Sequence, residues 1–547
     1  MKSLYFFIPA LFLAGSLNAQ KFYIDPVNGN PGGNGSVNNP WRTIEEVIEA
    51  NLIESFQPVH YPYDGTTELE LKNPGAPVGG GDTLVLRNGY HGEIVLLRYY
   101  NQNAVTIIAE EGHTPIISRL KLTAGKNWIF SGLTVSPEFA DTYVRNDLFR
   151  LESHNWSGPV TDVIIENCKG YSVSNASGWS AGDWDTLACS GISCSASNVH
   201  LINNELTNVN FGITVSGNNC IIRNNSIINF SGDGLRGLGN DLLFEYNIVK
   251  NCYDVNENHD DGFQSWVVEG ESPPERVTLR GNTIINYEDP EQPLRGTLQG
   301  IGLFDGPYIA WVIENNVIIV DHWHGISIYG GINCRVVNNT VVDLNDADPG
   351  PPWIRVADLK DGSHSENCFV RNNLAKSYII GEGVTSDHNI TIDDYDNFFI
   401  DYENKELRLK PGCIAIDAGT PDLAPGIDIA GTTRPMGQGY DIGAYEFLPA
   451  AGISENKFLP GKFSLSQNYP NPFNPATTIE YFLPKQSFLS VKLFDLLGNE
   501  ISTLVNEEKT AGSHSIKFNA DNFPSGVYFY QLKTNEIIIT KKMMLLR

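Results

Sequence analysis

The stretch LINNELTNVNFGITVSGNNCIIRNNSIINF, residues 201–230, decides the fold of this chain. It contains one phrase twice: an apolar run that ends in paired asparagines and continues into another apolar segment. The phrase recurs along the sequence, and its marker residues are Asn204, Asn225, Asn247, Asn282, Asn316, Asn339 and Asn373. Their separations are 21, 22, 35, 34, 23 and 34 residues, so a step near 22 repeats and some turns carry roughly a dozen extra residues.

A coil of about 22 residues with two or three short strands is the spacing of a right-handed parallel β-helix, in which each coil covers the next. We expect the stacked asparagines to share side-chain hydrogen bonds from coil to coil. The alternative, an Asn-rich β-sandwich, is disfavoured because sandwich strands do not keep one phase over so many units. The sequence therefore predicts an all-β protein built around a parallel β-helix.

A second apolar strand follows a glycine in each coil, at Gly191, Gly212, Gly234, Gly262, Gly300 and Gly325. Period-two alternation predicts that the residue after each glycine points inward, namely Ile192, Ile213, Leu235, Phe263, Ile301 and Ile326. The first outward column is then Ser193, Thr214, Arg236, Gln264, Gly302 and Ser327. The next outward column is Ser195, Ser216, Leu238, Trp266, Phe304 and Tyr329. The edge before the glycine reads Ser190, Phe211, Asp233, Asp261, Gln299 and His324.

One face of the predicted helix therefore gathers titratable groups beside aromatic rings. The candidate catalytic residues are His259, Asp261, Asp233, Arg236 and His324. The candidate substrate-binding residues are Gln264, Trp266, Phe304 and Tyr329. An outward file of rings on an exported protein suits a groove that stacks sugars, although stacked rings can also serve only to stabilise neighbouring strands.

The charge composition limits the classes of molecule that the protein can bind. With 37 Lys and Arg against 64 Asp and Glu, the net charge of −27 argues against binding to nucleic acid and complicates binding of an acidic polymer. Such a polymer would need a local basic groove or bridging cations.

Most of the eight cysteines are expected to be small buried fillers, since several begin apolar strands and no C-x-x-C pattern occurs.

The first residues predict export. Residues 1–19 have one Lys and a short apolar run before Ala19, which is typical of a signal peptide, and no later stretch has the length of a transmembrane helix. Farther on, Thr43 and Glu46 form a predicted capping box, followed by the apolar stripe Ile44, Val47, Ile48 and Leu52. This helix is expected to cap the open end of the β-helix.

The repeats, the N-terminal helix and the closing segment PGCIAIDAGTPDLAPGIDIAGTTRP resemble exported proteins of the pectate-lyase-like superfamily of right-handed parallel β-helices. The predicted β-helix covers residues 20–447. The resemblance is strong for the fold and weak for the reaction, because this architecture serves lyases, hydrolases, epimerases and non-catalytic surface proteins.

After a predicted linker, residues 448–461, the sequence changes character. Residues 462–547 contain NYPNPF at 468–473, a Gly526-Val527-Tyr528 strand and a basic terminus, and they resemble the C-terminal sorting domain of type IX secretion cargo. The resemblance implies a small β-sandwich recognised by the type IX secretion machinery. We expect a monomer that is exported through the periplasm and across the outer membrane, then secreted or attached to the cell surface.

Three chemistries fit such a groove. In a lyase or an epimerase acting on a uronate polysaccharide, His259 or His324 is the expected base and Arg236 neutralises the carboxylate. A calcium ion held by Asp254, Glu257 and Asp260 is the expected cofactor, because hard cations prefer carboxylate oxygens.

Hydrolysis is the second chemistry, since SGDG, HDDG and WHGISI resemble polygalacturonase signatures that assign acid and base roles to Asp233, Asp260 and Asp261. The chain departs from that family: the Gln299 coil separates HDDG from His324, and the Arg-x-Lys signature is missing. The third possibility is a surface glycan-binding or adhesin-like protein without catalysis. A lyase or related uronate-acting enzyme is the preferred hypothesis.

Overall fold

The structure is a computed structural model, and contacts divide the chain into two compact units, Met1–Leu448 and Pro449–Arg547. It describes residues 19–268, 270, 272–345 and 347–448 of the first unit. In the second it describes residues 464–465, 468, 471, 473, 475–483, 485–494, 500–510, 512–520, 523, 526–534 and 538–545. Except for Ala19 and Leu448, the predicted signal peptide and linker lie outside the described residues.

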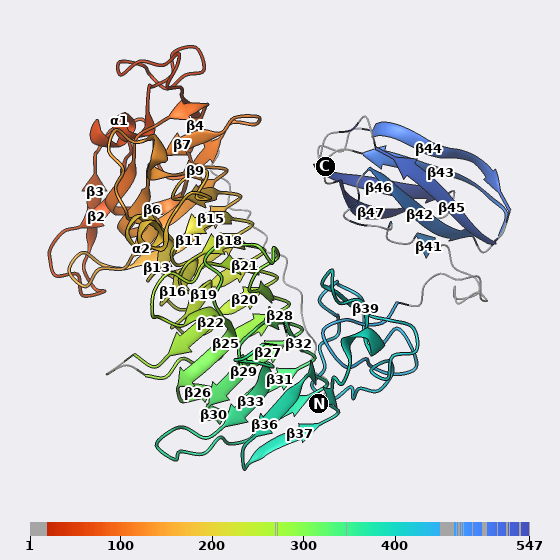
Figure 1. Cartoon of the computed structure of the whole chain (residues 1–547). Coiled ribbons are helices and arrows are strands. Elements are labelled where there is room, and N and C mark those ends of the chain that lie inside the picture. Colours follow the sequence, from red (N-terminus) through yellow and green to blue (C-terminus); the bar gives the residue numbers. More distant parts are fainter. Residues whose placement is uncertain are drawn as a thin grey trace. The chain divides into compact units, whose positions relative to one another are not determined.

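The first unit is a parallel β-helix with three ladders of strands, as predicted (Figure 1). The ladder that carries the site runs through β10 (Asp147–Glu152), β13 (Ser190–Cys194), β16 (Ile213–Val215), β19 (Leu235–Gly237), β22 (Asp260–Trp266), β25 (Leu298–Asp305), β29 (His324–Tyr329), β33 (Trp353–Ala357) and β36 (Ser377–Ile380). The second runs through β11 (Val160–Glu166), β14 (Ser197–Ile202), β17 (Ile221–Arg223), β20 (Leu243–Glu245), β23 (Thr278–Arg280), β27 (Val312–Glu314), β31 (Arg335–Val337), β34 (Cys368–Arg371) and β37 (Val384–Asp387).

Two long strands, β6 (Ile94–Ala109) and β8 (Leu120–Ser131), join these ladders into one 24-stranded sheet that also holds β1 (Lys21–Ile24), β2 (Ser55–Pro58), β3 (Leu69–Lys72) and β4 (Thr83–Leu86). The third ladder is a separate 12-stranded sheet. It comprises β5 (Gly89–Tyr90), β7 (Pro115–Ile117), β9 (Thr134–Val135), β12 (Lys169–Tyr171), β15 (Glu205–Val209), β18 (Ser226–Phe230), β21 (Ile248–Cys252), β24 (Thr283–Ile285), β28 (Val317–Val320), β32 (Thr340–Asp343), β35 (Leu374–Ala375) and β38 (Ile390–Thr391).

The marker asparagines form a continuous buried ladder at one corner. Each side-chain amide donates to the side-chain oxygen of the next asparagine at 2.9–3.0 Å, through Asn204, Asn225, Asn247, Asn282, Asn316, Asn339, Asn373 and finally Asn389. The same amides also donate to main-chain carbonyls, as Asn282 does to Phe244 O at 2.9 Å. The residue before each ladder position turns the corner with a positive φ, 55° at Asn224 and 57° at Asn315, which asparagine tolerates better than most residues. The ladder fixes the relative height of the coils from Asn204 to Asn389.

The register predicted for the site ladder is the register observed. Arg236 pairs with Gln264, Gln264 with Gly302, and Gly302 with Ser327. The inward column, Ile192, Ile213, Leu235, Phe263, Ile301 and Ile326, is almost completely buried. All eight cysteines are free and buried, in agreement with their expected role as fillers.

The predicted N-terminal helix is present as α1 (Ile44–Glu49), with Ile44 and Val47 buried against the β-helix core. The capping box is only half formed. The Thr43 hydroxyl accepts from the backbone of Glu46, but the Glu46 side chain pairs with Arg42, because that neighbouring cation competes for the carboxylate.

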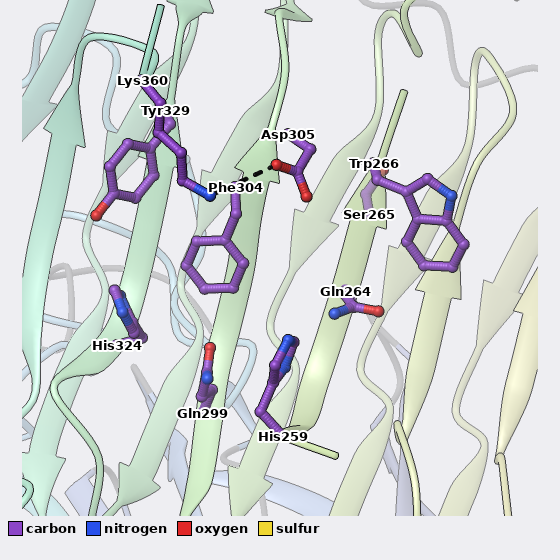
Figure 2. Close-up of a pocket in the computed structure, with 10 residues that line it drawn as sticks. All are labelled: His259, Gln264, Ser265, Trp266, Gln299, Phe304, Asp305, His324, Tyr329 and Lys360. Atoms are coloured by element: carbon purple, nitrogen blue, oxygen red, sulfur yellow. Dashed lines mark ion pairs between the residues drawn. The ribbon is translucent and has the colours of Figure 1, made fainter. Parts of the chain in front are cut away.

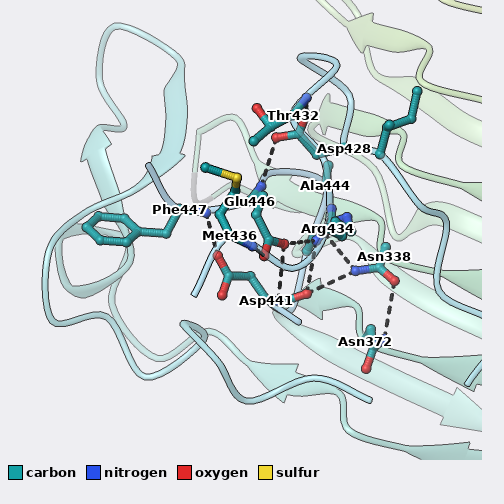
Figure 3. A network of polar contacts seen from close by, with 12 residues as sticks. Asn338, Asn372, Asp428, Thr432, Arg434, Met436, Asp441, Ala444, Glu446 and Phe447 are labelled. Carbon is teal, nitrogen blue, oxygen red and sulfur yellow. Dashed lines mark hydrogen bonds and ion pairs between the residues drawn. The ribbon is translucent and has the colours of Figure 1, made fainter. Parts of the chain in front are cut away.

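The end of the first unit folds back against the outer face of the 12-stranded sheet. This segment includes the hairpin β39 (Phe399–Asp401) and β40 (Glu406–Leu409), and its apolar side chains share a core with those of β28 and β32. Arg434 is buried in a 2.8 Å ion pair with Glu446 (Figure 3). Asn338 on the corner after β31 donates to the carbonyls of Asp441 and Gly443, which attaches this segment to the coils.

The second unit consists of two small antiparallel sheets around one apolar core, the predicted β-sandwich. One sheet contains β41 (Ser464–Leu465), β42 (Ala476–Leu483) and β45 (Gly512–Asn519). The other contains β43 (Ser487–Phe494), β44 (Glu500–Lys509), β46 (Gly526–Thr534) and β47 (Ile538–Leu545).

The ladder generates a stability prediction. Asn282→Ala removes an amide that bonds to both neighbouring coils, so we expect the free energy of unfolding to fall by roughly 3 kcal/mol, since buried partners lose their hydrogen bonds. The midpoint of chemical unfolding measures the loss. The control Asn258→Ala changes an exposed loop residue and should alter stability by less than about 0.5 kcal/mol. Equal midpoints for the two variants would contradict the role of the ladder.

Candidate functional site

The outer face of β22, β25 and β29 is hollowed by a cavity of about 490 Å³ (Figure 2). Three successive coils and one long loop line it, with His259, Gln264, Ser265, Trp266, Gln299, Phe304, Asp305, His324, Tyr329 and Lys360. Because successive coils stack in register, side chains far apart in the sequence share this wall. Six of the predicted site residues come together here, namely His259, His324, Gln264, Trp266, Phe304 and Tyr329.

A histidine and an aspartate form a dyad at this wall. Asp261 Oδ2 lies 3.2 Å from His259 Nδ1 and accepts a hydrogen bond from Gln264 Nε2 at 3.0 Å. An ionised carboxylate can only accept, so the Nδ1–H of His259 donates. The His259 side chain is 61% exposed whereas Asp261 is fully buried. Asp261 therefore acts through His259, and only the histidine can meet a molecule in the cavity.

Glycine at position 302 makes room for this buried carboxylate. A Cβ at Gly302 would lie 2.3 Å from Asp261 Oδ1 and 2.5 Å from the ring of Phe304. Asp261 Oδ1 has no hydrogen-bond partner among the residues that the structure describes.

Asp233 and Arg236 support the dyad from the preceding coil. Asp233 Oδ1 accepts from the backbone N–H of Asp261 at 2.9 Å, and its Oδ2 accepts from Arg236 Nε at 2.5 Å. The guanidinium lies 3.6 Å from the ring centre of Phe211 and 5.6 Å from that of Trp266. Arg236 is thus committed to Asp233 and two rings, and neither member of this ion pair lines the cavity.

Burial sets the protonation of the carboxyl groups. It raises the pKa of Asp260 to about 7 and that of Asp261 to about 7, and it raises the pKa of Asp233 despite the nearby Arg236. The hydrogen bond to Asp261 raises the pKa of His259 above its usual range. Each member of the pair therefore changes the protonation equilibrium of the other.

His324 forms the opposite wall. Its Nδ1 lies 2.8 Å from the hydroxyl of Ser327, which also accepts from Trp353 Nε1 at 3.1 Å. Burial, with a contribution from His322, lowers the pKa of His324 to about 4. His324 is therefore neutral at neutral pH and is a much weaker base than His259.

The predicted aromatic file is broken, and this prediction was wrong in one position. The register shifts between Ser265 and Trp266. Trp266 therefore pairs with Asp305, whereas the sequence had predicted that it would lie beside Phe304. Phe304 and Tyr329 remain neighbours, with ring centres 5.9 Å apart. Figure 2 shows Trp266 separated from them across the cavity. A β-bulge adds a residue to one strand, and strict alternation along the sequence cannot reveal it.

Sequence reasoning missed several residues of this wall. Asp305 and Lys360 line the cavity, and Lys360 Nζ lies 3.8 Å from Asp305 Oδ1 (Figure 2). Lys360 belongs to a long loop after β33 that carries no repeat signal. Arg355 is not part of the lining, but it pairs with Ser327, so extending the outward column by one coil would have placed it next to this wall.

The residues expected to bind calcium do not converge on one point among the described residues. Asp260 is buried and accepts from Cys252 Sγ at 3.4 Å, while Asp254 and Glu257 are exposed. Among the described residues no group of three or more His, Cys, Asp or Glu side chains is arranged to hold a metal ion. Calcium binding therefore stays a prediction from the sequence, and we assign it no step.

Comparison with known families identifies the second unit. Residues 467–546 match the secretion system C-terminal sorting domain. The chain therefore carries a type IX sorting domain, and the protein is secreted or attached to the cell surface. Among the described residues, no helix is long and apolar enough to span a membrane. No curated protein gives a significant match.

Three solved structures are among those to which the chain is similar. They are the A-module of a mannuronan C-5 epimerase from Azotobacter vinelandii (11% identity, TM-score 0.31, 57% of this chain and 91% of that one), a GH136 lacto-N-biosidase from Eubacterium ramulus (11%, 0.33, 68% and 68%) and the Dettilon tailspike protein (14%, 0.26, 82% and 74%). Similarity this low decides neither substrate nor reaction.

The packing around Gly302 can be tested directly. In Gly302→Ala, the added methyl group would overpack the wall beneath the cavity and push Asp261 and Phe304 out of place. We expect the free energy of unfolding to fall by about 1–3 kcal/mol. The control Gly178→Ala adds a methyl group with no heavy atom within 4 Å and should be close to neutral. If Gly302→Ala unfolds at the same denaturant concentration as the control, the described arrangement of Asp261 is incorrect.

Proposed function

We propose that the protein is an enzyme that abstracts a proton from a uronate residue of a polysaccharide, as a lyase or an epimerase, with His259 as the base. The observation that carries this proposal is the dyad of exposed His259 and buried Asp261 at the wall of an aromatic-lined cavity. A general base must reach the substrate and be held in one tautomer, and this pair meets both conditions.

The reaction follows from the dyad. Asp261 accepts the Nδ1–H of His259, and among the described residues the Nε2 atom has no hydrogen-bond partner. Nε2 takes the proton from the sugar carbon next to the carboxylate. In elimination, the electrons of that C–H bond form the new double bond, the bond to the glycosidic oxygen breaks, and the departing oxygen gains a proton. In epimerisation, a proton returns to the same carbon from the opposite face.

Two cations near the cavity can bind the carboxylate of such a sugar. Lys360 lines the rim and is 79% exposed, with Asp305 as its only ion-pair partner among the described residues. The guanidinium of Arg355 lies 4.7 Å from the ring centre of Tyr329, and it has no ion pair within the described part of the chain. These positive groups supply the local field that the acidic protein as a whole does not.

Hydrolysis by a carboxylate pair receives less support from the geometry. That mechanism needs two carboxyl groups facing the scissile bond. Asp233, Asp260 and Asp261 are all buried, and Asp305 is the acidic residue that lines the cavity. Glycan binding without catalysis is the second candidate, favoured by the half-buried rings of Trp266, Phe304 and Tyr329 at the cavity wall.

Removal of the base tests the proposal. Incubation with pectate or alginate should release unsaturated products, detected by ultraviolet absorbance, or epimerised residues, detected by NMR. His259→Ala should reduce turnover by about 10²–10⁴-fold, the usual contribution of a general base, and leave polysaccharide binding largely intact. His364→Ala is the matched control, because His364 also pairs with an aspartate but lies outside the cavity. Binding without turnover by the unmodified protein would favour the glycan-binding candidate.

The dyad also predicts a pH effect. His259 acts as a base only when neutral, so kcat/KM should fall as the pH drops through its raised pKa. Asp261→Asn removes the largest cause of the raised pKa of His259. The negative charges of Asp233 and Asp260 remain and continue to raise this pKa. The acidic limb of the kcat/KM profile should therefore move to lower pH. An acidic limb that stays in place would exclude Asp261 as the positioning residue for His259.

A further inference from the structure

We infer that the first unit has a second ligand site, for an acidic sugar residue, on the outer face of its 12-stranded sheet. A cavity of about 410 Å³ lies there, separate in its lining from the one that holds the dyad. Its lining includes Tyr287, Arg295, Asn345, Tyr402, Glu403 and Lys405. This site is independent of the reaction proposed for His259.

Three segments distant in sequence build the cavity. Tyr287 and Arg295 come from the long loop after β24, Asn345 follows β32, and Tyr402 and Lys405 belong to the β39–β40 hairpin. The hairpin packs on this sheet through the core that it shares with β28, and Figure 1 shows β39 beside β28 and β32. The cavity exists only because the chain folds back, so it is not a gap between repeated coils.

The two tyrosine rings are held in place. Tyr287 OH accepts from Asn345 Nδ2 at 3.2 Å. Tyr402 OH donates to the Asp343 carbonyl, and its ring stacks on Tyr395 with centres 4.0 Å apart. Tyr287 is buried and helps to shape the cavity, whereas the half-buried Tyr402 ring offers a fixed apolar surface on which a pyranose can lie at little cost in side-chain entropy.

The cations of this cavity are not neutralised by carboxylates. Arg295 lies 5.1 Å from the ring centre of Tyr287, and it has no ion pair or hydrogen bond within the described ranges. Within the described part of the chain, the one hydrogen bond of Lys405 Nζ goes to a main-chain oxygen, that of Glu288, at 3.5 Å. The Glu288 carboxylate itself is paired with Lys250 at 2.7 Å. Glu403 is the acidic residue of the lining, so two positive charges face one negative charge.

A ligand that satisfies this lining needs an apolar ring face and an anionic group. A carboxylate-bearing pyranose has both, since the carboxylate can bind Arg295 and Lys405 while the ring contacts a tyrosine. A neutral sugar would leave the cations without a partner, and a small inorganic anion would leave the Tyr402 ring without an apolar contact. The geometry therefore favours a uronate residue.

The test uses the full chain with Trp266→Ala and Phe304→Ala, which disable the first cavity, and the probe is a trisaccharide of galacturonate. Calorimetry should detect binding in this background. Adding Arg295→Ala and Lys405→Ala should weaken it by at least about tenfold, the effect of losing one charge-assisted hydrogen bond. Lys169→Ala, on the same sheet outside the cavity, is the matched control for the loss of positive charge and should bind normally.

Other outcomes decide against the site. No binding once the first cavity is disabled, or equal affinity with and without Arg295 and Lys405, overturns the inference. Equal binding of the neutral galactose trisaccharide, or complete competition by sulfate at matched ionic strength, overturns the assignment to an acidic sugar. Turnover is measured separately in the otherwise unmodified protein. Absent turnover with retained, Arg295-dependent binding rejects the proposed reaction and leaves the second site standing.

Discussion

The buried asparagine ladder is the constraint on which the coils that carry the candidate site depend. A carboxamide inside a protein must find partners for its donors and its acceptor, and each ladder asparagine finds them only when the neighbouring coil lies at one height. A slip by one residue would leave several amides unpaired and would also turn the apolar column outward. Because both penalties act together, loops of very different length can be inserted between coils without disturbing the register.

That fixed register explains how a site arises on a repetitive scaffold. The positions occupied by Thr214 and Ser327 in other coils hold Arg236, Gln264 and Gly302 in the middle of the ladder. Each change is local to its own coil, yet stacking makes them neighbours. Gly302 admits the carboxylate of Asp261, and Asp261 orients His259. The repeated residues fix the positions of the coils, and the residues that differ from coil to coil are the candidate functional groups.

The same logic separates what the sequence predicted from what it could not. The step of about 22 residues and the glycine alignment predicted the ladders, their register and the face of the site, because these follow from periodicity. The bulge at Trp266 and the burial of Asp261 depend on packing between coils, which periodicity does not encode. Lys360 and the second cavity come from segments without a repeat. The predicted metal ligands lie close in sequence, but Asp260 points into the body and Glu257 outward.

Both cavities have positively charged side chains in or beside their lining, although the chain as a whole is negatively charged. A chain with a net charge of −27 repels an acidic polymer at long range, so any affinity for one must come from short-range contacts with cations that no carboxylate already holds. Most arginines of the coils are committed, as Arg280 is to Glu314 at 2.6 Å. Arg355 beside the first cavity and Arg295 with Lys405 in the second lack such partners among the described residues. Cations without a carboxylate partner beside aromatic rings are available to bind an anionic ligand, and their coincidence with both cavities supports acidic sugars as ligands of this exported β-helix.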